Sequence, residues 1–167
     1  MKNFNSFLKK LLDKPSTKTI LSIQGKKKKI KAMARFTTVN YQGDEYIKIV
    51  FNDHSFMLIL TKEREIYYAD KILGHARKIT DEMIGKEETI QYKGKKYRLD
   101  NKDDYQFCLQ LYLGTPFDIE GECRFSDYFP VKGPKEFLSL GWLSYNGERA
   151  DINPKIISLE EIEIVKK

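Results

Sequence analysis

The stretch 45-EYIKIVFNDHSFMLILT-61 sets the class of fold, because two strongly apolar runs flank the polar tetrapeptide 52-NDHS-55. Each run has the length and the β-branched and aromatic content of a strand. Asn, Asp and Ser are typical of tight turns, since their side chains bond to the local backbone. The stretch therefore predicts two neighbouring strands joined by a turn.

Segments of the same kind recur along most of the chain, separated by short polar turns, and Gly43 stands where a hairpin needs a positive φ. The expected strands are 19-TILSIQ-24, 30-IKAMARFTTV-39, 88-ETIQY-92, 95-KKYRLD-100, 105-YQFCLQLYL-113, 117-FDIEGECRF-125 and 136-EFLSLGWLSY-145. The tail 158-SLEEIEIVKK-167 fits two structures. Ser158 and Glu161 match a helical capping box, whereas Ile162 and Ile164 alternate as in a strand, which we favour.

Two segments follow a helical period instead. An amphipathic helix is expected in residues 1–14, capped by Asn3 or Asn5 and stopped by Pro15; its apolar positions are Phe4, Phe7, Leu8, Leu11 and Leu12. A second, internal helix is expected within residues 70–85, with Gly85 as its C-terminal stop; its apolar positions are Ile72, Ala76, Ile79 and Met83.

Residues 39–60 align with residues 90–111 at a constant offset, with seven identities in 22 positions. A duplicated β-meander explains the match, and so does the recurrence of Tyr-x-Gly hairpins in any antiparallel sheet. If the chain is duplicated, six residues should face inward at equivalent positions of the two copies: Phe56, Leu58, Leu60, Phe107, Leu109 and Leu111.

These patterns predict an α+β fold that is mainly antiparallel β, either as pseudo-duplicated meanders or as a barrel-like sheet. The chain length of 167 residues suits a single domain, 1–167. Its expected parts are the N-terminal helix (1–14), a first meander (18–69), the internal helix (70–85) and a second β-rich half (88–167).

Charge is divided unevenly along the chain, whose formal net charge is +6. Residues 1–35 carry eleven basic side chains and one acidic one, whereas the remaining residues carry a net charge of −4. Such a division points to an anionic partner or to internal pairing. We expect the partner at the basic strand, through Lys26, Lys27, Lys29, Lys31 and Arg35.

Three interpretations of the basic segment remain open. Single-stranded nucleic acid could bind lysines beside exposed aromatic rings. A membrane surface could bind the apolar face of residues 1–14 together with the lysines. Alternatively, the lysines could pair across the sheet with the acidic stripe Asp118, Glu120 and Glu122.

That acidic stripe is also a weak candidate for a metal site, because three carboxylates lie on one face of an expected strand. Strand neighbours on one face are about 6.5–7 Å apart, so further ligands such as Asp103, Asp104 or Asp127 would have to join. A solvent-facing strand explains the pattern more simply. Neither His54, beside Asp53, nor His75 has a partner at metal-ligand spacing. No nucleotide-binding glycine motif is present, and no cofactor is predicted.

The two cysteines, Cys108 and Cys123, lie in apolar strand contexts, which favours buried free thiols and a reducing compartment. No apolar span is long enough to cross a membrane, and the N-terminus lacks the pattern of a signal peptide. We therefore expect a cytoplasmic protein.

The run 97-YRLDNKDDYQF-107, together with Gly121-Glu122, Asp127-Tyr128 and Leu138-Ser139, resembles a bacterial β-rich family known only as a domain of unknown function. The resemblance covers about the last 80 residues. It implies a non-catalytic bacterial protein and carries no activity or site with it. The resulting expectation is a small binding or accessory module; the alternative is a metal-dependent enzyme that uses the acidic stripe or the Asp53-His54 turn.

Overall fold

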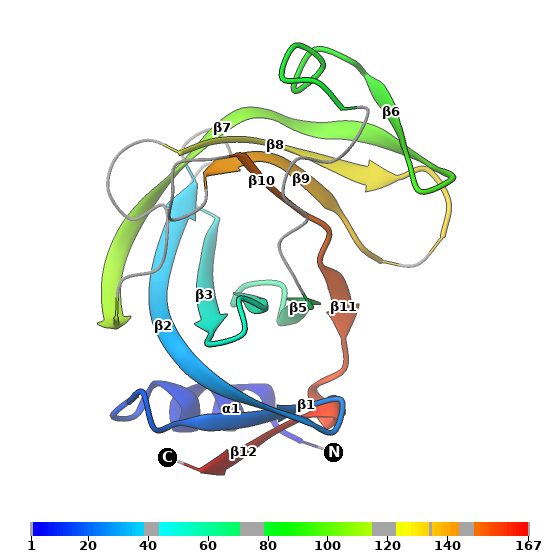
Figure 1. The fold of residues 1–167 in the computed structure, drawn as a ribbon. Coiled ribbons are helices and arrows are strands. Elements are labelled where there is room, and N and C mark those ends of the chain that lie inside the picture. Colours follow the sequence, from blue (N-terminus) through cyan, green and yellow to red (C-terminus); the bar gives the residue numbers. More distant parts are fainter. Residues whose placement is uncertain are drawn as a thin grey trace.

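The computed structural model of the protein describes residues 2–38, 44–70, 79–114, 123–133, 135–143 and 149–166. In these ranges the chain forms one α-helix, one short 3-10 helix and twelve strands (Figure 1). In chain order they are α1 (Phe4–Leu12), β1 (Ile20–Ile23), β2 (Lys26–Thr38), β3 (Glu45–Phe51), β4 (Phe56–Leu60), β5 (Glu65–Ala69), β6 (Thr89–Tyr92), β7 (Lys95–Leu113), β8 (Cys123–Pro130), β9 (Leu138–Leu143), β10 (Arg149–Ile152), β11 (Lys155–Ile157), η1 (Leu159–Glu161) and β12 (Ile162–Lys166). The expected class, mainly antiparallel β with an N-terminal helix, is confirmed.

The twelve described strands form one antiparallel sheet. Nine of them follow the order β10-β9-β8-β7-β2-β3-β4-β5-β11, while β1 pairs with β2 and β12, and β6 pairs with β7. In a flat sheet the eight intervals of this order, of about 4.8 Å each, would place the two end strands about 38 Å apart. However, β10 and β11 are joined by only Asn153 and Pro154, which span at most about 11 Å. The sheet must therefore curl until its ends meet, as Figure 1 shows.

Strand β2, which pairs with β3, β7 and β1, is visibly curved (Figure 1). Its register against β3 shifts between Ile30 and Ala32, and its register against β7 shifts at two further places. An irregularity of this kind bends the strand and increases its twist. One long strand can thereby belong to both walls of the curl.

Helix α1 is docked on the domain. The Asn3 side chain caps it by accepting a hydrogen bond from the backbone N–H of Ser6 at 2.9 Å, one of the two caps expected. Phe7 and Leu11 are buried in the core, and Lys2 Nζ donates to the carbonyl of Ile162 at 2.6 Å. The apolar face that a membrane could have bound is therefore covered by the protein's own sheet.

Strand β4 separates two cores, because its alternate residues face opposite ways. Met57 and Ile59 pack with α1, β1 and β12, whereas Phe56 and Leu58 face the interior of the curl. There they meet side chains from the β8–β10 side of the sheet, such as Phe125. Both faces of this strand are thus covered, which explains its continuous apolar sequence.

The internal helix is a wrong prediction for the part of 70–85 that the structure describes. Residues 79–80 are irregular and 81–86 form turns, with Ile79 buried against the β6–β9 side; residues 71–78 lie outside the described ranges. The helical spacing of Ile79 and Met83 reflects the side of a loop that packs on a sheet. Strands β5, β10 and β11 were not predicted, because they are short and lie next to polar residues.

The duplication is also wrong. Residues 45–60 form two strands, β3 and β4, with a turn between them, whereas the matching residues 96–111 lie in the uninterrupted strand β7. Phe56 and Leu58 are buried, but Phe107, Leu109 and Leu111 are about half exposed, at 46%, 51% and 51%. The barrel-like alternative describes the sheet better, since both walls belong to one continuous curl.

The C-terminal segment satisfies both of its expected patterns in succession. Ser158 and Glu161 form a capping box around η1, with the backbone N–H of Ser158 donating to Glu161 Oε2 at 2.7 Å, and β12 follows immediately. Among the described residues, no helix is both long enough and apolar enough to span a membrane.

Candidate functional site

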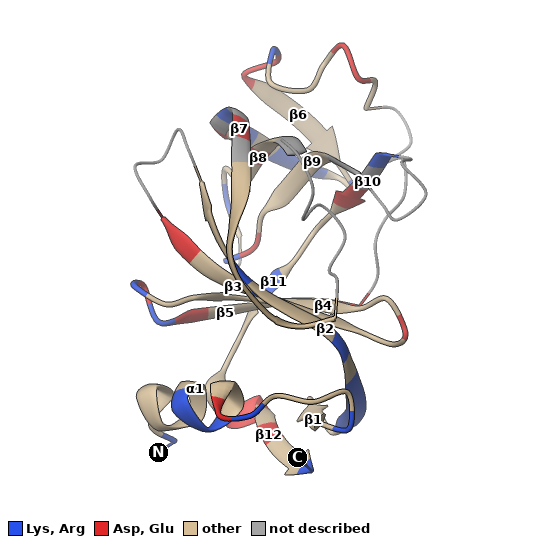
Figure 2. Ribbon diagram, turned by 90° about the vertical axis from the view of Figure 1, so that its left-hand side faces the viewer, with Lys and Arg blue, Asp and Glu red and all other residues tan. Residues whose placement is uncertain are grey.

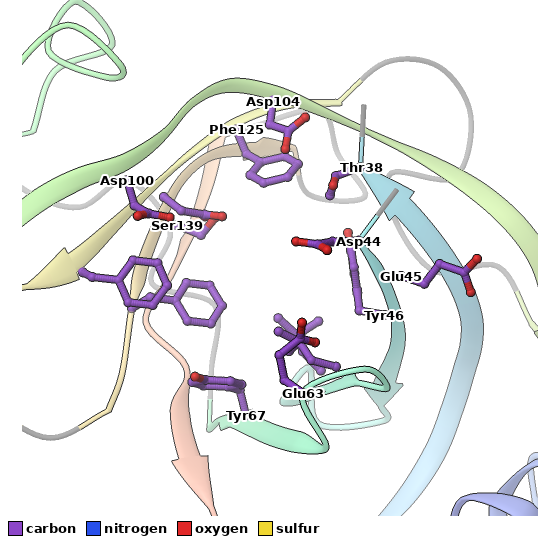
Figure 3. A pocket seen from close by; sticks show the side chains of 15 residues that line it. Thr38, Asp44, Glu45, Tyr46, Glu63, Tyr67, Asp100, Asp104, Phe125 and Ser139 are labelled. Carbon is purple, nitrogen blue, oxygen red and sulfur yellow. The ribbon is translucent and has the colours of Figure 1, made fainter. Parts of the chain in front are cut away.

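A cavity of about 170 Å³ lies inside the curl, between β3–β5 on one wall and β7–β9 on the other (Figure 3). We call it the acidic cavity. Its described lining consists of Thr38, Asp44, Glu45, Tyr46, Leu58, Leu60, Glu63, Tyr67, Asp100, Asp104, Phe125, Asp127, Phe129, Phe137 and Ser139. The residues come from strands far apart in the sequence, so only the curl brings them together.

Aromatic rings form much of the wall. Phe125, Asp127 and Phe129 all face the cavity because they occupy alternate positions of β8. The Phe137 ring meets the Tyr67 ring edge to face at a centroid distance of 5.2 Å and the Phe129 ring at 5.7 Å. The three rings support one another and present a preformed aromatic surface.

The two tyrosines of the lining are held by their hydroxyl groups. Tyr67 donates to Glu65 Oε2 at 2.8 Å, and Tyr46 donates to Gln106 Oε1. Burial, followed by the bond to Glu65, raises the pKa of Tyr67. The phenol therefore stays protonated at neutral pH, and its ring remains fixed at the base of the cavity.

The charged groups of the described lining are all acidic: six carboxylates line it, and none of the residues is Lys, Arg or His. They are Asp44, Glu45, Glu63, Asp100, Asp104 and Asp127. In Figure 3, Asp44 points toward the interior, whereas Glu45 turns away to the outer side of the sheet, where its Oε2 lies 3.8 Å from Arg35. The described lining itself therefore contributes only negative charge, and Lys62 Nζ lies 3.9 Å from Asp44 Oδ1 outside it.

The carboxylates are arranged around the cavity rather than at one point. In the part of the chain that the structure describes, no three His, Cys, Asp or Glu side chains are grouped closely enough to hold a metal ion. A compact divalent cation needs such convergence of oxygen ligands. A larger organic cation, whose charge is distributed over several groups, does not need its ligands to converge on one point.

The predicted lysines lie on a different part of the molecule. Lys26, Lys27, Lys29 and Lys31 are exposed at the start of β2, and we call β1, β2 up to Lys31 and the turn between them the lysine hairpin (Figure 2). Arg35 does not join them. It lies half-buried farther along β2, where its guanidinium is 6.0 Å from the Tyr112 ring and beside Glu45.

Lys28, in the middle of the run, is engaged within the fold. Its ammonium pairs with Asp53, which also accepts from the hydroxyl of Ser55 at 2.6 Å. Burial opposes ionisation of Asp53, but these bonds outweigh it and lower the pKa of the carboxyl. Asp53 therefore anchors the lysine hairpin to the β3–β4 turn.

The other sequence candidates are only partly described. Asp118, Glu120 and Glu122 lie outside the described ranges, as does His75. Asp104 and Asp127, named as possible additional ligands, do come together in the lining of the acidic cavity. The aromatic wall was missed, although the alternation in 125-FSDYF-129 is a usable signal for one face of it.

Among the described residues, the Asp53-His54 turn has no neighbours that would complete a catalytic relay. His54 is exposed at a positive φ of 64°, and the hydrogen bonds and ion pair of Asp53 lead to Ser55 and Lys28. Cys108 is a half-buried free thiol whose pKa is raised by burial, which disfavours the nucleophilic thiolate.

Comparison of the chain with protein-family models, with curated proteins and with solved structures found no match. The assignment of a function consequently depends on the chemistry of the described residues.

Proposed function

We propose that the protein is a small binding module whose acidic cavity takes the head group of an organic cation. One observation carries the proposal: five carboxylates, without the outward-turned Glu45, and five aromatic rings line the same cavity, and its described lining contains no basic side chain. Aromatic faces attract cations through the ring quadrupole, and quaternary ammonium groups are recognised in this way. The surrounding carboxylates add a longer-range attraction.

The size of the cavity limits the ligand. Its volume of about 170 Å³ is below the usual range for drug-sized ligands, which begins at about 300 Å³, and is close to the space that holds one benzene ring. A trimethylammonium group or a comparable alkylammonium group fits that limit. The rest of such a ligand would extend toward solvent.

Binding rather than catalysis is proposed because of the kinds of side chain present. The described lining contains carboxylates, hydroxyls and rings but no His, Lys or Cys, so carboxylates are its only candidate bases and nucleophiles at neutral pH. The Ser139 hydroxyl donates to Asp127, and no imidazole in the described lining completes a relay.

The test compares choline with its neutral carbon analogue, in which a quaternary carbon replaces the nitrogen, by calorimetric titration at low salt. The two molecules have nearly the same shape, so a difference in affinity reports charge. We expect choline to bind at least about tenfold more tightly, equivalent to about 1.4 kcal/mol. Equal affinities, or no binding of either molecule, would overturn the proposal.

The lysine hairpin supports a second candidate function, the binding of an anionic partner such as a nucleic acid or an acidic protein. Lys26, Lys27 and Lys29 are exposed together on a strand that β1 and the Lys28–Asp53 pair hold in place. An ordered row of ammonium groups suits phosphate or carboxylate contacts. The two candidate sites are compatible, because the hairpin contributes none of the described lining of the acidic cavity.

A further inference from the structure

A second cavity, of about 400 Å³, lies where the two ends of the sheet meet. It is bordered by the end of β5, the β6–β7 turn, the start of β7 and the β10–β11 connection. We call it the Glu136 cavity, after the buried carboxylate in its wall. Its volume falls within the usual range of about 300–1,000 Å³ for small-molecule sites.

Glu136 is only 1% exposed and is held rigidly. Its Oε1 accepts from Lys95 Nζ at 2.6 Å and from the Tyr97 hydroxyl at 2.8 Å, while its backbone bridges to Lys155. Burial opposes ionisation, but the bonds from Lys95 and Tyr97 and the nearby positive charges lower the pKa of the carboxyl. Glu136 is therefore an ionised group that can only accept hydrogen bonds at neutral pH.

Its second oxygen is unsatisfied. No donor among the described residues reaches Oε2, although this atom is buried and belongs to a carboxylate that lines the cavity. A buried charged acceptor without a partner is costly, and unsatisfied groups of this kind are rare in folded proteins. A ligand that donates a hydrogen bond at this point would remove the cost.

The charges around the cavity indicate which kind of group would donate to Glu136 Oε2 and which charge the ligand would carry. The Lys95 ammonium already balances the charge of Glu136, so a hydroxyl suits Oε2 better than a further ammonium. Lys93 and Lys155 are exposed side chains of the lining, against a single additional carboxylate, Asp70. The accessible part of the cavity therefore favours an anionic group.

The geometry points to a site for a small hydroxylated anion, with a hydroxyl donating to Glu136 Oε2 and the anionic group bound by Lys93 and Lys155. A monosaccharide phosphate and a sugar acid share this chemistry and fit the volume of the cavity. Binding here does not depend on the organic cation proposed for the acidic cavity.

The test is a calorimetric panel of glucose 6-phosphate, ribose 5-phosphate and glucuronate beside glucose and inorganic phosphate. We expect at least one hydroxylated anion to bind at least tenfold more tightly than both glucose and phosphate. Phosphate binding as tightly as the sugar phosphates would show a simple electrostatic contact and overturn the proposal, as would no binding of any hydroxylated anion.

Variants then locate the site. Glu136→Gln keeps the shape of the side chain but replaces the accepting Oε2 with a donating amide. It should lower the affinity for the tightest-binding anion of the panel at least tenfold. Because that side chain is buried, Lys155→Gln supplies a variant on the exposed side, with an expected loss of about three- to tenfold. Lys96→Gln is the matched control, since Lys96 is exposed on β7 next to Lys95 but outside the described lining, and its change should alter affinity less than twofold.

One outcome would count against the site. If neither Glu136→Gln nor Lys155→Gln weakens the anion beyond the Lys96→Gln control, the anion binds elsewhere. The affinity of Lys155→Gln for choline should equal that of the unaltered protein, which keeps this result separate from the test of the acidic cavity.

Discussion

The described lining of the acidic cavity and the lysine hairpin carry opposite charge, although β2 contributes to both. The described lining of the acidic cavity contains six carboxylates and no basic group, whereas the hairpin exposes Lys26, Lys27, Lys29 and Lys31 within six residues. Thr38, at the far end of the same strand, lines the cavity. Figure 2 shows the basic residues concentrated at the end of β2 near α1.

This comparison shows that the net charge of a chain does not predict the charge of each of its surfaces. The value of +6 is dominated by the N-terminal residues, which fold as an outer layer. The acidic residues that face the cavity come from β7, β8 and the segments next to β3 and β5, and the curl gathers them on the inner surface. A basic protein can therefore contain a site suited to a cation.

The largest expected effect concerns the layer that supports the lysine hairpin. Leu11 of α1 is fully buried beneath it, so Leu11→Ala should lower the free energy of unfolding by about 2–5 kcal/mol. Leu109→Ala is the matched control, because Leu109 is 51% exposed and should cost less than about 1 kcal/mol. Denaturant unfolding of both variants provides the measurement.

Equal and small losses for the two leucines would contradict the comparison. The basic segment would then be a loosely attached extension rather than a layer of the same fold.

Acid should destabilise both regions. Burial alone would raise the pKa of the carboxyl groups of Asp53 and Glu65. The bonds from Lys28 and Ser55 nevertheless lower the pKa of Asp53 beside the hairpin, and the bonds from Lys135 and Tyr67 lower the pKa of Glu65 beside the cavity. A lowered folded-state pKa stabilises the fold above the unfolded value of about 4, and this contribution is lost as pH falls through the folded value.

Melting temperatures measured between pH 7 and pH 2 test this prediction. The unaltered protein should lose stability below about pH 4, and Asp53→Asn or Glu65→Gln should each flatten part of the decline. Unchanged pH profiles in both variants would mean that these pairs contribute nothing to stability.

Neutralising the rim of the cavity should weaken cation binding alone. Asp44→Asn combined with Glu63→Gln removes two partly exposed carboxylates of the lining and should reduce choline affinity by about three- to tenfold at low salt. The control is Glu82→Gln with Glu87→Gln, which removes the same charge from exposed positions outside the described lining. Equal losses in the two double variants would show that only the net charge matters.

Neutralising the lysines of the hairpin should affect the binding of an anionic partner but not the binding of choline, and this is the smallest effect that we expect. The change of Lys26, Lys27 and Lys29 to Gln should leave choline affinity unaltered and reduce the salt slope of oligonucleotide binding by about two, since each single-strand contact contributes about 0.7. Fluorescence anisotropy with a short single-stranded oligonucleotide measures the slope. The control changes Lys86, Lys96 and Lys132 to Gln.

No oligonucleotide binding at low salt would exclude nucleic acid as the anionic partner, because the electrostatic attraction is strongest under that condition. Equal slopes for the two triple variants would place the contacts elsewhere.

Local patterns predicted the local elements well. The hairpin of β3 and β4 and the helix α1 depend on neighbouring residues, through a polar turn in one case and a helical apolar period with Asn3 as cap in the other. The similarity of residues 39–60 and 90–111 led to the wrong prediction of a duplication. Alternation shows which residues share a face of a strand, but it does not show whether other parts of the protein cover that face. Phe56 is buried and Phe107 is half exposed for this reason.

The sites were harder to predict, since curling of the sheet creates them. Asp104 and Asp127 lie on neighbouring strands and were named as possible ligands. Tyr67 and Phe137 line the same cavity only because the two walls of the sheet face each other. The exposed lysines could be anticipated, because they follow one another along a single strand.

The central claim is that a cation binds among the rings of the acidic cavity, and its position can be measured directly. Nuclear Overhauser effects from the N-methyl protons of bound choline should reach the ring protons of Tyr67 and Phe129, which lie on opposite walls of the cavity. Effects to both rings would confirm the site. Saturable choline binding that shows no effect to either ring would contradict it.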